Sequence, residues 1–171
     1  MTSGTVAAQA DRDAAQELVD RFAPIVMVAT QDQHCDPEGE AFRPMSVDLV
    51  LDNDDVLLRQ AGEADPVVRR APGAADLFGR GDGFFLDFNG LALEPGCVYE
   101  HDFESYTNGS DPVVYAHVVK QTDSPDQIAV QYWFYWYYND WNNKHESDWE
   151  FIQVLFEAPT IAAALDGDPS S

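Results

Sequence analysis

Alternation of apolar and polar positions is clearest in the second half of the chain, where it predicts a β-hairpin. The segment VVYAHVVK alternates, a turn follows at TDSPDQ, and residues 128–138 are β-branched or aromatic almost throughout. Successive strand residues point to opposite faces, and large aromatic side chains fall on both faces of residues 128–138. We therefore expect this strand to be buried on both sides or to flank a ligand groove. A last strand is expected over 148–157.

The first half of the chain carries weaker patterns. Residues 11–22 place apolar side chains four positions apart, which predicts a short amphipathic helix. Short strands are expected at 23–30 and at FFLDF, residues 84–88. Residues 61–83 are rich in Gly, Pro and Ala, and they are expected to be the loosest part of the chain.

These elements predict a mainly β protein, an antiparallel β-sandwich with one or two peripheral helices. The expected organisation is an N-terminal helical segment over 1–23, a β-sandwich domain over 24–158 and a flexible C-terminal tail over 159–171. A chain of 171 residues has the size of one domain and enough apolar residues to build a packed core.

The charge of the chain excludes one class of partner. Nine Lys and Arg residues stand against 31 Asp and Glu, which gives a net charge of −22. Such a surface repels phosphate backbones, so nucleic-acid binding is not expected, and it attracts cations. No apolar run is long enough to span a membrane.

The two cysteines leave the compartment open. No signal peptide is visible in this chain, which makes a cytoplasmic location the default. A disulfide between Cys35 and Cys97 would instead indicate an extracytoplasmic, oxidising compartment. Two free thiols fit the sequence equally well.

Of the histidines outside the segment described next, His117 is expected to pack on the sheet, and His34 and His101 are expected at the surface.

The segment NDWNNKHESDWE, between the last two strands, concentrates the chemistry. Asp148 and Glu150 are two apart on a strand and share a face, and His145 in the preceding turn can reach the same place. A divalent cation would relieve the repulsion between the two carboxylates. Such an oxygen-rich set favours calcium, magnesium or manganese, with Asp140 or Asn143 as a further ligand.

A plain polar turn is the alternative interpretation. Asn and Asp side chains often bond their own backbone in turns, and Glu150 could pair with Lys144 or Lys120. A zinc peptidase site is excluded, because Trp149 occupies the position of the second histidine of the HExxH motif.

The stretch YWFYWYYNDWNNKHESDWEFIQVLF resembles the signature of the vacuolar protein sorting-associated protein 62 family and its bacterial relatives. That signature is an aromatic strand, an Asn-rich turn and an H-x-G-D-W-E segment that ends in a strand. The pieces FAPIVMV, FRPMSVD, EPGCVYE and PVVYAHV also resemble that family, so the resemblance covers most of residues 20–157. Members of the family continue well past the D-W-E strand, which implies that the β-sandwich domain here is incomplete or shortened.

HESDWE is more distantly similar to the H-R-H-D-W-E core of the necrosis- and ethylene-inducing-like proteins. These are secreted β-sandwich cytolysins that bind a divalent cation and sphingolipid head groups. The resemblance implies that His145, Asp148 and Glu150 stand at metal-ligand positions. The sequence departs from the motif at Ser147, where the families have His or Gly, and at Glu146, where the cytolysins have Arg.

Three functions follow as hypotheses. The first is a divalent-cation-dependent module that binds a sugar or glycolipid head group, with the rings of Trp133, Trp136 and Trp141 as stacking faces. The second is a hydrolase in which the cation activates a water and Glu146 or Asp140 is the base. The third is a structural interaction domain of a larger protein, with self-association as a further expectation. The spacing requires no catalytic residue, so the binding module is favoured over an enzyme.

Overall fold

The computed structural model describes residues 3–29, 31–36, 41–64, 66–120 and 122–170. They form two antiparallel three-stranded sheets and four α-helices, with much of the remainder in loops. The chain divides into two compact units. The first comprises Met1–Val26, Tyr115–Trp133 and Phe151–Ser171, and the second comprises Met27–Val114 and Phe134–Glu150.

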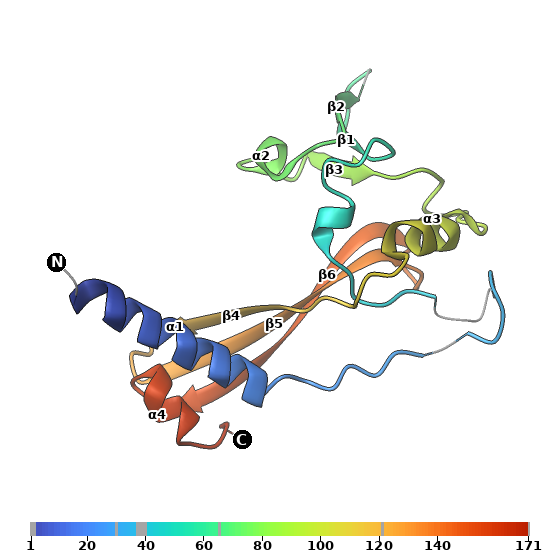
Figure 1. Cartoon of the computed structure of the whole chain (residues 1–171). Helices are drawn as coiled ribbons and strands as arrows, with labels where there is room; N and C mark the ends of the chain where they lie inside the picture. The colour runs from blue at the N-terminus through green and yellow to red at the C-terminus, as the bar shows by residue number, and fades with distance from the viewer. Residues whose placement is uncertain (1–2, 30, 37–40, 65, 121, 171) are drawn as a thin grey trace. The chain divides into compact units, whose positions relative to one another are not determined.

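The first unit packs two helices on a sheet. Helix α1 (Ser3–Arg21) lies along the sheet, and the short helix α4 (Ile161–Leu165) lies beside its C-terminal end (Figure 1). Strand β4 (Tyr115–Lys120) pairs with β5 (Gln127–Asn139), and β6 (His145–Glu157) follows in the order β4-β5-β6. The part of β5 after Trp133 and the part of β6 before Phe151 belong to the second unit.

Apolar burial explains why α1 docks on the sheet. Leu18 is fully buried, and the ring of Phe22 meets the edge of Phe156 with 4.8 Å between centroids. The hydroxyl of Tyr132 donates to the Val19 carbonyl at 2.8 Å, which satisfies a polar group that the strand would otherwise bury. Fully burying a side chain of the size of Leu18 contributes about 1.5–3 kcal/mol to folding.

The second unit contains the other sheet, in the order β2-β1-β3. Its strands are β1 (Leu57–Gln60), β2 (Val67–Arg70) and β3 (Phe84–Asp87), its α-helices are α2 (Ala74–Leu77) and α3 (Val98–Thr107), and a 3₁₀ turn spans Val47–Leu49.

Aromatic rings form the core of this unit. Tyr99 of α3 stacks on Tyr138 of β5 with 4.3 Å between ring centroids, and Phe88 stacks on Tyr137 at 4.6 Å. The buried cluster consists of Phe42, Met45, Val50, Val56, Phe88, Tyr99, Phe103, Tyr135, Tyr137 and Tyr138. Because Tyr137 and Tyr138 are neighbours with opposite side-chain directions, aromatic residues from both faces of β5 are buried, as expected from the sequence.

The hairpin of β4 and β5 is confirmed, with a register that runs from Tyr115↔Trp133 to Lys120↔Ile128. The FFLDF strand is confirmed as β3. The helix expected at 11–22 is present as α1, which begins earlier.

Other expectations were wrong. Residues 23–29 form no helix or strand, and the side chains of Ile25 and Met27 are almost fully exposed. The stretch 61–83, expected to be loose, contains β2 and α2. His117 is exposed rather than packed. The range expected as a flexible tail carries α4.

Candidate functional site

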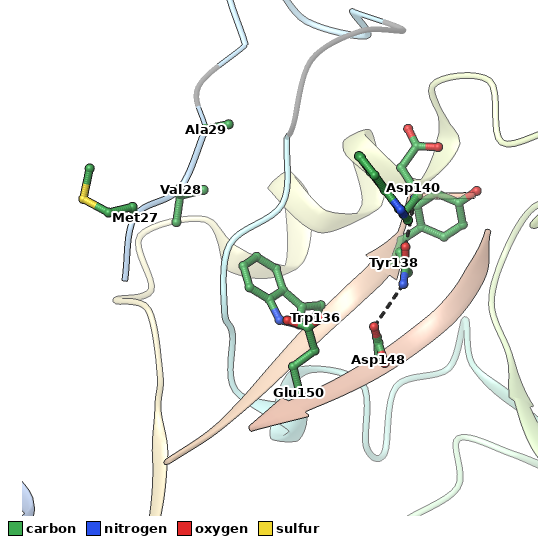
Figure 2. A pocket seen from close by; sticks show the side chains of 10 residues that line it. Met27, Val28, Ala29, Trp136, Tyr138, Asp140, Asp148 and Glu150 are labelled. Atoms are coloured by element: carbon green, nitrogen blue, oxygen red, sulfur yellow. Dashed lines mark hydrogen bonds between the residues drawn. The ribbon is translucent and has the colours of Figure 1, made fainter. Parts of the chain in front are cut away.

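Asp148 and Glu150 of the D-W-E segment line a pocket of about 380 Å³. The three carboxylates of Asp140, Asp148 and Glu150 share this pocket with the indole ring of Trp136 (Figure 2). The indole of Trp141 lines it as well. The other lining residues are Met27, Val28, Ala29, Tyr138 and Asn139. The volume lies in the lower part of the range that small-molecule sites occupy, about 300–1,000 Å³.

Asn139 fixes the position of one carboxylate. Its amide nitrogen donates to Oδ2 of Asp148 at 3.0 Å, and its Oδ1 accepts from the backbone N–H of Trp141 at 2.8 Å. The second contact is an Asx turn, the local bond that Asn commonly makes at the end of a strand. The Asn139 side chain therefore positions the Asp148 carboxylate and the backbone of Trp141. The sequence pattern did not identify this role.

A backbone carbonyl fixes one ring nitrogen of His145. Its Nδ1 lies 2.7 Å from the carbonyl oxygen of Asn143, and since a carbonyl only accepts, Nδ1 carries the proton. The lone pair of a neutral ring is then on Nε2, which lies 3.6 Å from Oδ1 of Asp148. Metal-binding histidines usually have such a second hydrogen bond, because it fixes the tautomer and the ring direction.

The charge of Asp140 is compensated by a neighbour. Nζ of Lys144 lies 2.5 Å from Oδ1 of Asp140, an ion pair across one turn of chain. The other lysine considered as a partner for Glu150, Lys120, donates instead to the Pro159 carbonyl at 2.9 Å. Asp148 and Glu150 therefore carry the negative charge that a cation in this pocket would meet first.

The expected triad is brought together only in part. His145 and Asp148 are neighbours, and Asp148 and Glu150 line the same pocket. Among the residues that the structure describes, two sets of three metal-ligand atoms lie within 4.8 Å of one another, and neither set contains His145, Asp148 or Glu150. As they stand, these three residues do not form one compact set of ligand atoms.

The tryptophans expected to form one stacking surface are divided. Trp136 and Trp141 line the pocket, and the Trp141 side chain is largely exposed. The ring of Trp133 stacks on Phe151, with 4.5 Å between centroids, and is not among the lining residues.

Burial, with the nearby charges of Asp140 and Glu146, raises the pKa of Tyr138 to about 12, so this lining phenol keeps its proton at neutral pH.

Glu146 has a structural role that the sequence did not indicate. Its carboxylate accepts from the backbone N–H of Phe88 at 3.0 Å and from the hydroxyl of Tyr99. Burial raises the pKa of Glu146, although both hydrogen bonds act in the opposite direction. Burial, followed by the contact with Glu146, raises the pKa of Tyr99. Glu146 thereby connects β6 to α3 and to the residue after β3.

Ser147 has a backbone conformation that is rare in a strand. Its φ is +59°, in the left-handed region that glycine adopts most readily. Its hydroxyl lies 2.7 Å from that of Tyr135 on the neighbouring strand. This local change of direction separates Glu146, which faces the core, from Asp148, which faces the pocket.

Cys35 and Cys97 form a disulfide, with their Cα atoms 5.3 Å apart. The bond ties the loop that contains Cys35 to the start of α3, across a sequence separation of 62 residues. Of the two states that the sequence left open, the structure has the bridged one.

None of the helices in the described part of the chain has the length and hydrophobicity needed to cross a bilayer. Comparison with protein families, with curated proteins and with solved structures gave no match for this chain.

Proposed function

We propose that this protein is a divalent-cation-dependent binding module for a sugar or a glycolipid head group. The observation that supports it is the composition of one pocket, in which Asp140, Asp148 and Glu150 meet the indoles of Trp136 and Trp141. Carboxylates accept hydrogen bonds from sugar hydroxyls or hold a cation that binds them, and aromatic faces pack against the C–H face of a sugar ring.

The cation would be calcium, magnesium or manganese. Asp148 and Glu150 supply hard oxygen ligands, and Nε2 of His145 is directed toward Asp148. In a chain with a net charge of −22, a bound divalent ion also removes local repulsion between carboxylates.

The resemblance to the vacuolar protein sorting-associated protein 62 family and, more distantly, to the necrosis- and ethylene-inducing-like proteins forms part of this proposal. The β-sandwich and the extracytoplasmic location belong to it as well. The positive φ of Ser147 supports the resemblance at one position, because glycine is the residue that the closer family has there.

The geometry favours binding over hydrolysis. Of the two bases considered for a hydrolase, Glu146 accepts hydrogen bonds from Phe88 and Tyr99, and Asp140 pairs with Lys144. A general base needs an acceptor that faces the substrate, and both of these carboxylates are engaged by protein groups. An interaction domain of a larger protein remains the alternative if the pocket binds no cation.

The first test is thermal unfolding with added divalent ions. Calcium, magnesium or manganese at about 100 times its dissociation constant stabilises the folded state by about 2.7 kcal/mol, which raises the melting temperature. Sodium chloride at matched ionic strength controls for screening of the net charge. The double variant Asp148→Asn with Glu150→Gln removes two ligand charges and should abolish the divalent-specific part of the shift.

A matched control changes the net charge equally at another place. Asp11→Asn with Glu17→Gln removes two exposed charges from α1 and should keep the divalent response. An equal response of the wild type and the pocket variant would disprove the cation site. Glycan-array binding that requires the effective cation and is lost in Trp141→Ala would support the sugar ligand, whereas cation binding without any glycan would overturn it.

A further inference from the structure

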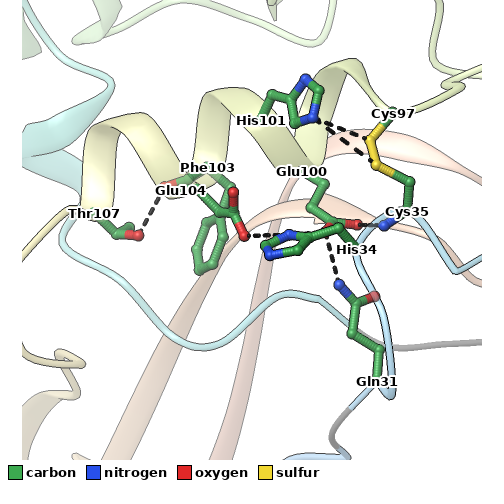
Figure 3. A network of polar contacts seen from close by, with 9 residues as sticks. All are labelled: Gln31, His34, Cys35, Cys97, Glu100, His101, Phe103, Glu104 and Thr107. Atoms are coloured by element: carbon green, nitrogen blue, oxygen red, sulfur yellow. Dashed lines mark hydrogen bonds and ion pairs between the residues drawn. A yellow bond between two sulfur atoms is a disulfide. The ribbon is translucent and has the colours of Figure 1, made fainter.

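A second group of ligand atoms lies beside the disulfide. Nδ1 of His34 is 3.1 Å from Oε1 of Glu100 and 2.9 Å from Oε1 of Glu104 (Figure 3). The three atoms lie within 4.8 Å of one another, which makes this one of the two compact ligand sets in the described residues. It shares no residue with the pocket of the D-W-E segment.

Two constraints hold the group together. Glu100 and Glu104 are one turn apart on α3, so their side chains extend from the same helix face. His34 precedes Cys35, and the disulfide from Cys35 to Cys97 holds that loop at the start of the same helix. The arrangement is therefore largely formed before any ligand arrives.

The buried member of the group is oriented by further contacts. Only 8% of the Glu100 side chain is exposed. Its Oε2 accepts from the backbone N–H of Cys35 at 2.8 Å, and its Oε1 accepts from Nε2 of Gln31 at 2.7 Å. A buried carboxylate with both oxygens fixed in this way resembles the outer contacts that orient metal ligands in proteins.

A proton on the His34 ring cannot fully satisfy both glutamate side chains. Oε1 of Glu100 and Oε1 of Glu104 both lie close to the same ring atom, Nδ1 of His34. That nitrogen carries at most one hydrogen, so it can donate fully to only one of the two carboxylates. Like charges at i and i+4 on a helix also repel, which applies to Glu100 and Glu104. A divalent ion accepts the imidazole nitrogen and both carboxylates at once and neutralises the two negative charges.

We propose that His34, Glu100 and Glu104 bind a divalent transition-metal ion, with Zn²⁺ as the preferred ion. Tetrahedral ligands about 2.0–2.1 Å from zinc are roughly 3.3 Å from each other, close to the separations of 3.1 Å and 2.9 Å between Nδ1 of His34 and the two carboxylate oxygens. The compact spacing of one imidazole and two carboxylates suits the small tetrahedral sphere of Zn²⁺, whereas the pocket lined by Asp140, Asp148 and Glu150 has a third carboxylate and suits the larger, oxygen-rich sphere of Ca²⁺. Three protein ligands leave one position on the zinc for water. This site is independent of the proposed sugar-binding function.

The test is calorimetric titration of the full, metal-stripped chain with zinc chloride, without reductant. His34→Gln and Glu104→Gln each remove one ligand, and their side chains are 74% and 46% exposed, so both variants should fold. His117→Gln is the matched control, because it removes an exposed histidine of β4. The double variant Asp148→Asn with Glu150→Gln tests whether zinc binds instead in the pocket that these two residues line.

We expect one equivalent of Zn²⁺ on the wild type, with affinity at least tenfold weaker in His34→Gln and Glu104→Gln and unchanged in His117→Gln and in the pocket variant. Cobalt should show the visible bands of tetrahedral coordination in the wild type and lose them in His34→Gln. Unchanged affinity in His34→Gln overturns the site. So does binding that appears only after reduction, because Cys35, Cys97 and His101 form the other ligand set and would then supply thiolates.

Discussion

Glu146 shows how a single residue in a chemically suggestive segment can be structural. It stands directly after His145 in the HESDWE segment, yet its carboxylate is engaged by Phe88 and Tyr99. An unpaired backbone N–H at Phe88 would cost about 1–3 kcal/mol, so the contact stabilises the fold. The neighbours His145 and Asp148 face one another instead.

The raised pKa of Glu146 predicts a pH-dependent contribution to stability. The folded state holds this proton more tightly than the unfolded chain, where the pKa is near its ordinary 4.5. The contribution is therefore fully present below that value and is lost as the pH rises through the folded-state pKa. Glu146→Gln, which resembles the protonated carboxyl, removes this dependence.

Urea unfolding of both proteins between pH 4 and 8 measures the effect. The free energy of unfolding of the wild type, minus that of the variant, should increase as the pH falls, because the other carboxylates are common to both and cancel. A difference that is constant over this range would show that Glu146 is not desolvated in the folded state.

At the scale of elements, the disulfide connects a loop without regular structure to helix α3. Cross-linking across 62 residues restricts the unfolded chain, and in the chain-entropy model such a loop contributes about 4 kcal/mol. Replacing Cys35 and Cys97 by Ala should lower the free energy of unfolding by an amount of this order.

Thiol titration of the denatured, unreduced protein checks the bond itself. We expect no reactive thiol, whereas two thiols per chain would contradict both the disulfide and the oxidising compartment. Chemical unfolding of the double Ala variant then gives the magnitude, with the reduced wild type as a second reference.

The elements that the sequence predicted are those with dense, regular patterns. The hairpin and β3 combine β-branched or aromatic residues with flanking turn residues, and the structure confirms them. The apolar run at 23–30 has the same composition, but a strand needs a neighbour to pair with, and residues 23–29 form none. Composition alone does not supply that partner.

Helix α3 was missed although a signal was present. Tyr99, Phe103 and Tyr106 recur at helical spacing, and Pro95 precedes the helix start. The surrounding Gly, Cys and charged residues obscured this period. His34 and Glu100 are 66 positions apart, so no local pattern could bring them together.

The site was predictable to the extent that it is local. Asp148 and Glu150 are neighbours along one strand, and alternation was enough to place them together. The role of Asn139 and the separation of Trp133 from Trp136 depend on packing partners that sequence spacing does not specify.

At the scale of the whole molecule, charge and exposed apolar groups act in opposite directions. A net charge of −22 keeps copies of the chain apart. Strand β6 lies at the edge of its sheet and leaves Trp149, Phe151 and Ile152 between 43% and 51% exposed. Exposed strand edges with apolar residues favour pairing between chains.

We predict self-association that depends on concentration and increases with salt. Light scattering over a wide concentration range, at low and at about 0.5 M sodium chloride, should show dimers first where charge repulsion is screened. Ile152→Lys adds a charge to the edge and should shift the equilibrium toward the monomer. Scattering from a monomer alone at both salt concentrations would contradict the prediction.

The contact between α1 and α4 has a consequence for synthesis on the ribosome. Arg21 donates to the Leu165 carbonyl at 2.5 Å, across 144 positions of chain. At about 5–20 residues per second, α1 leaves the ribosome roughly 7–30 s before its partner helix is made. During that interval Leu18 and Phe22 lack the native contacts that bury them in the folded protein, and they stay accessible to chaperones. Helix α1 is therefore made well before the helix that it docks against.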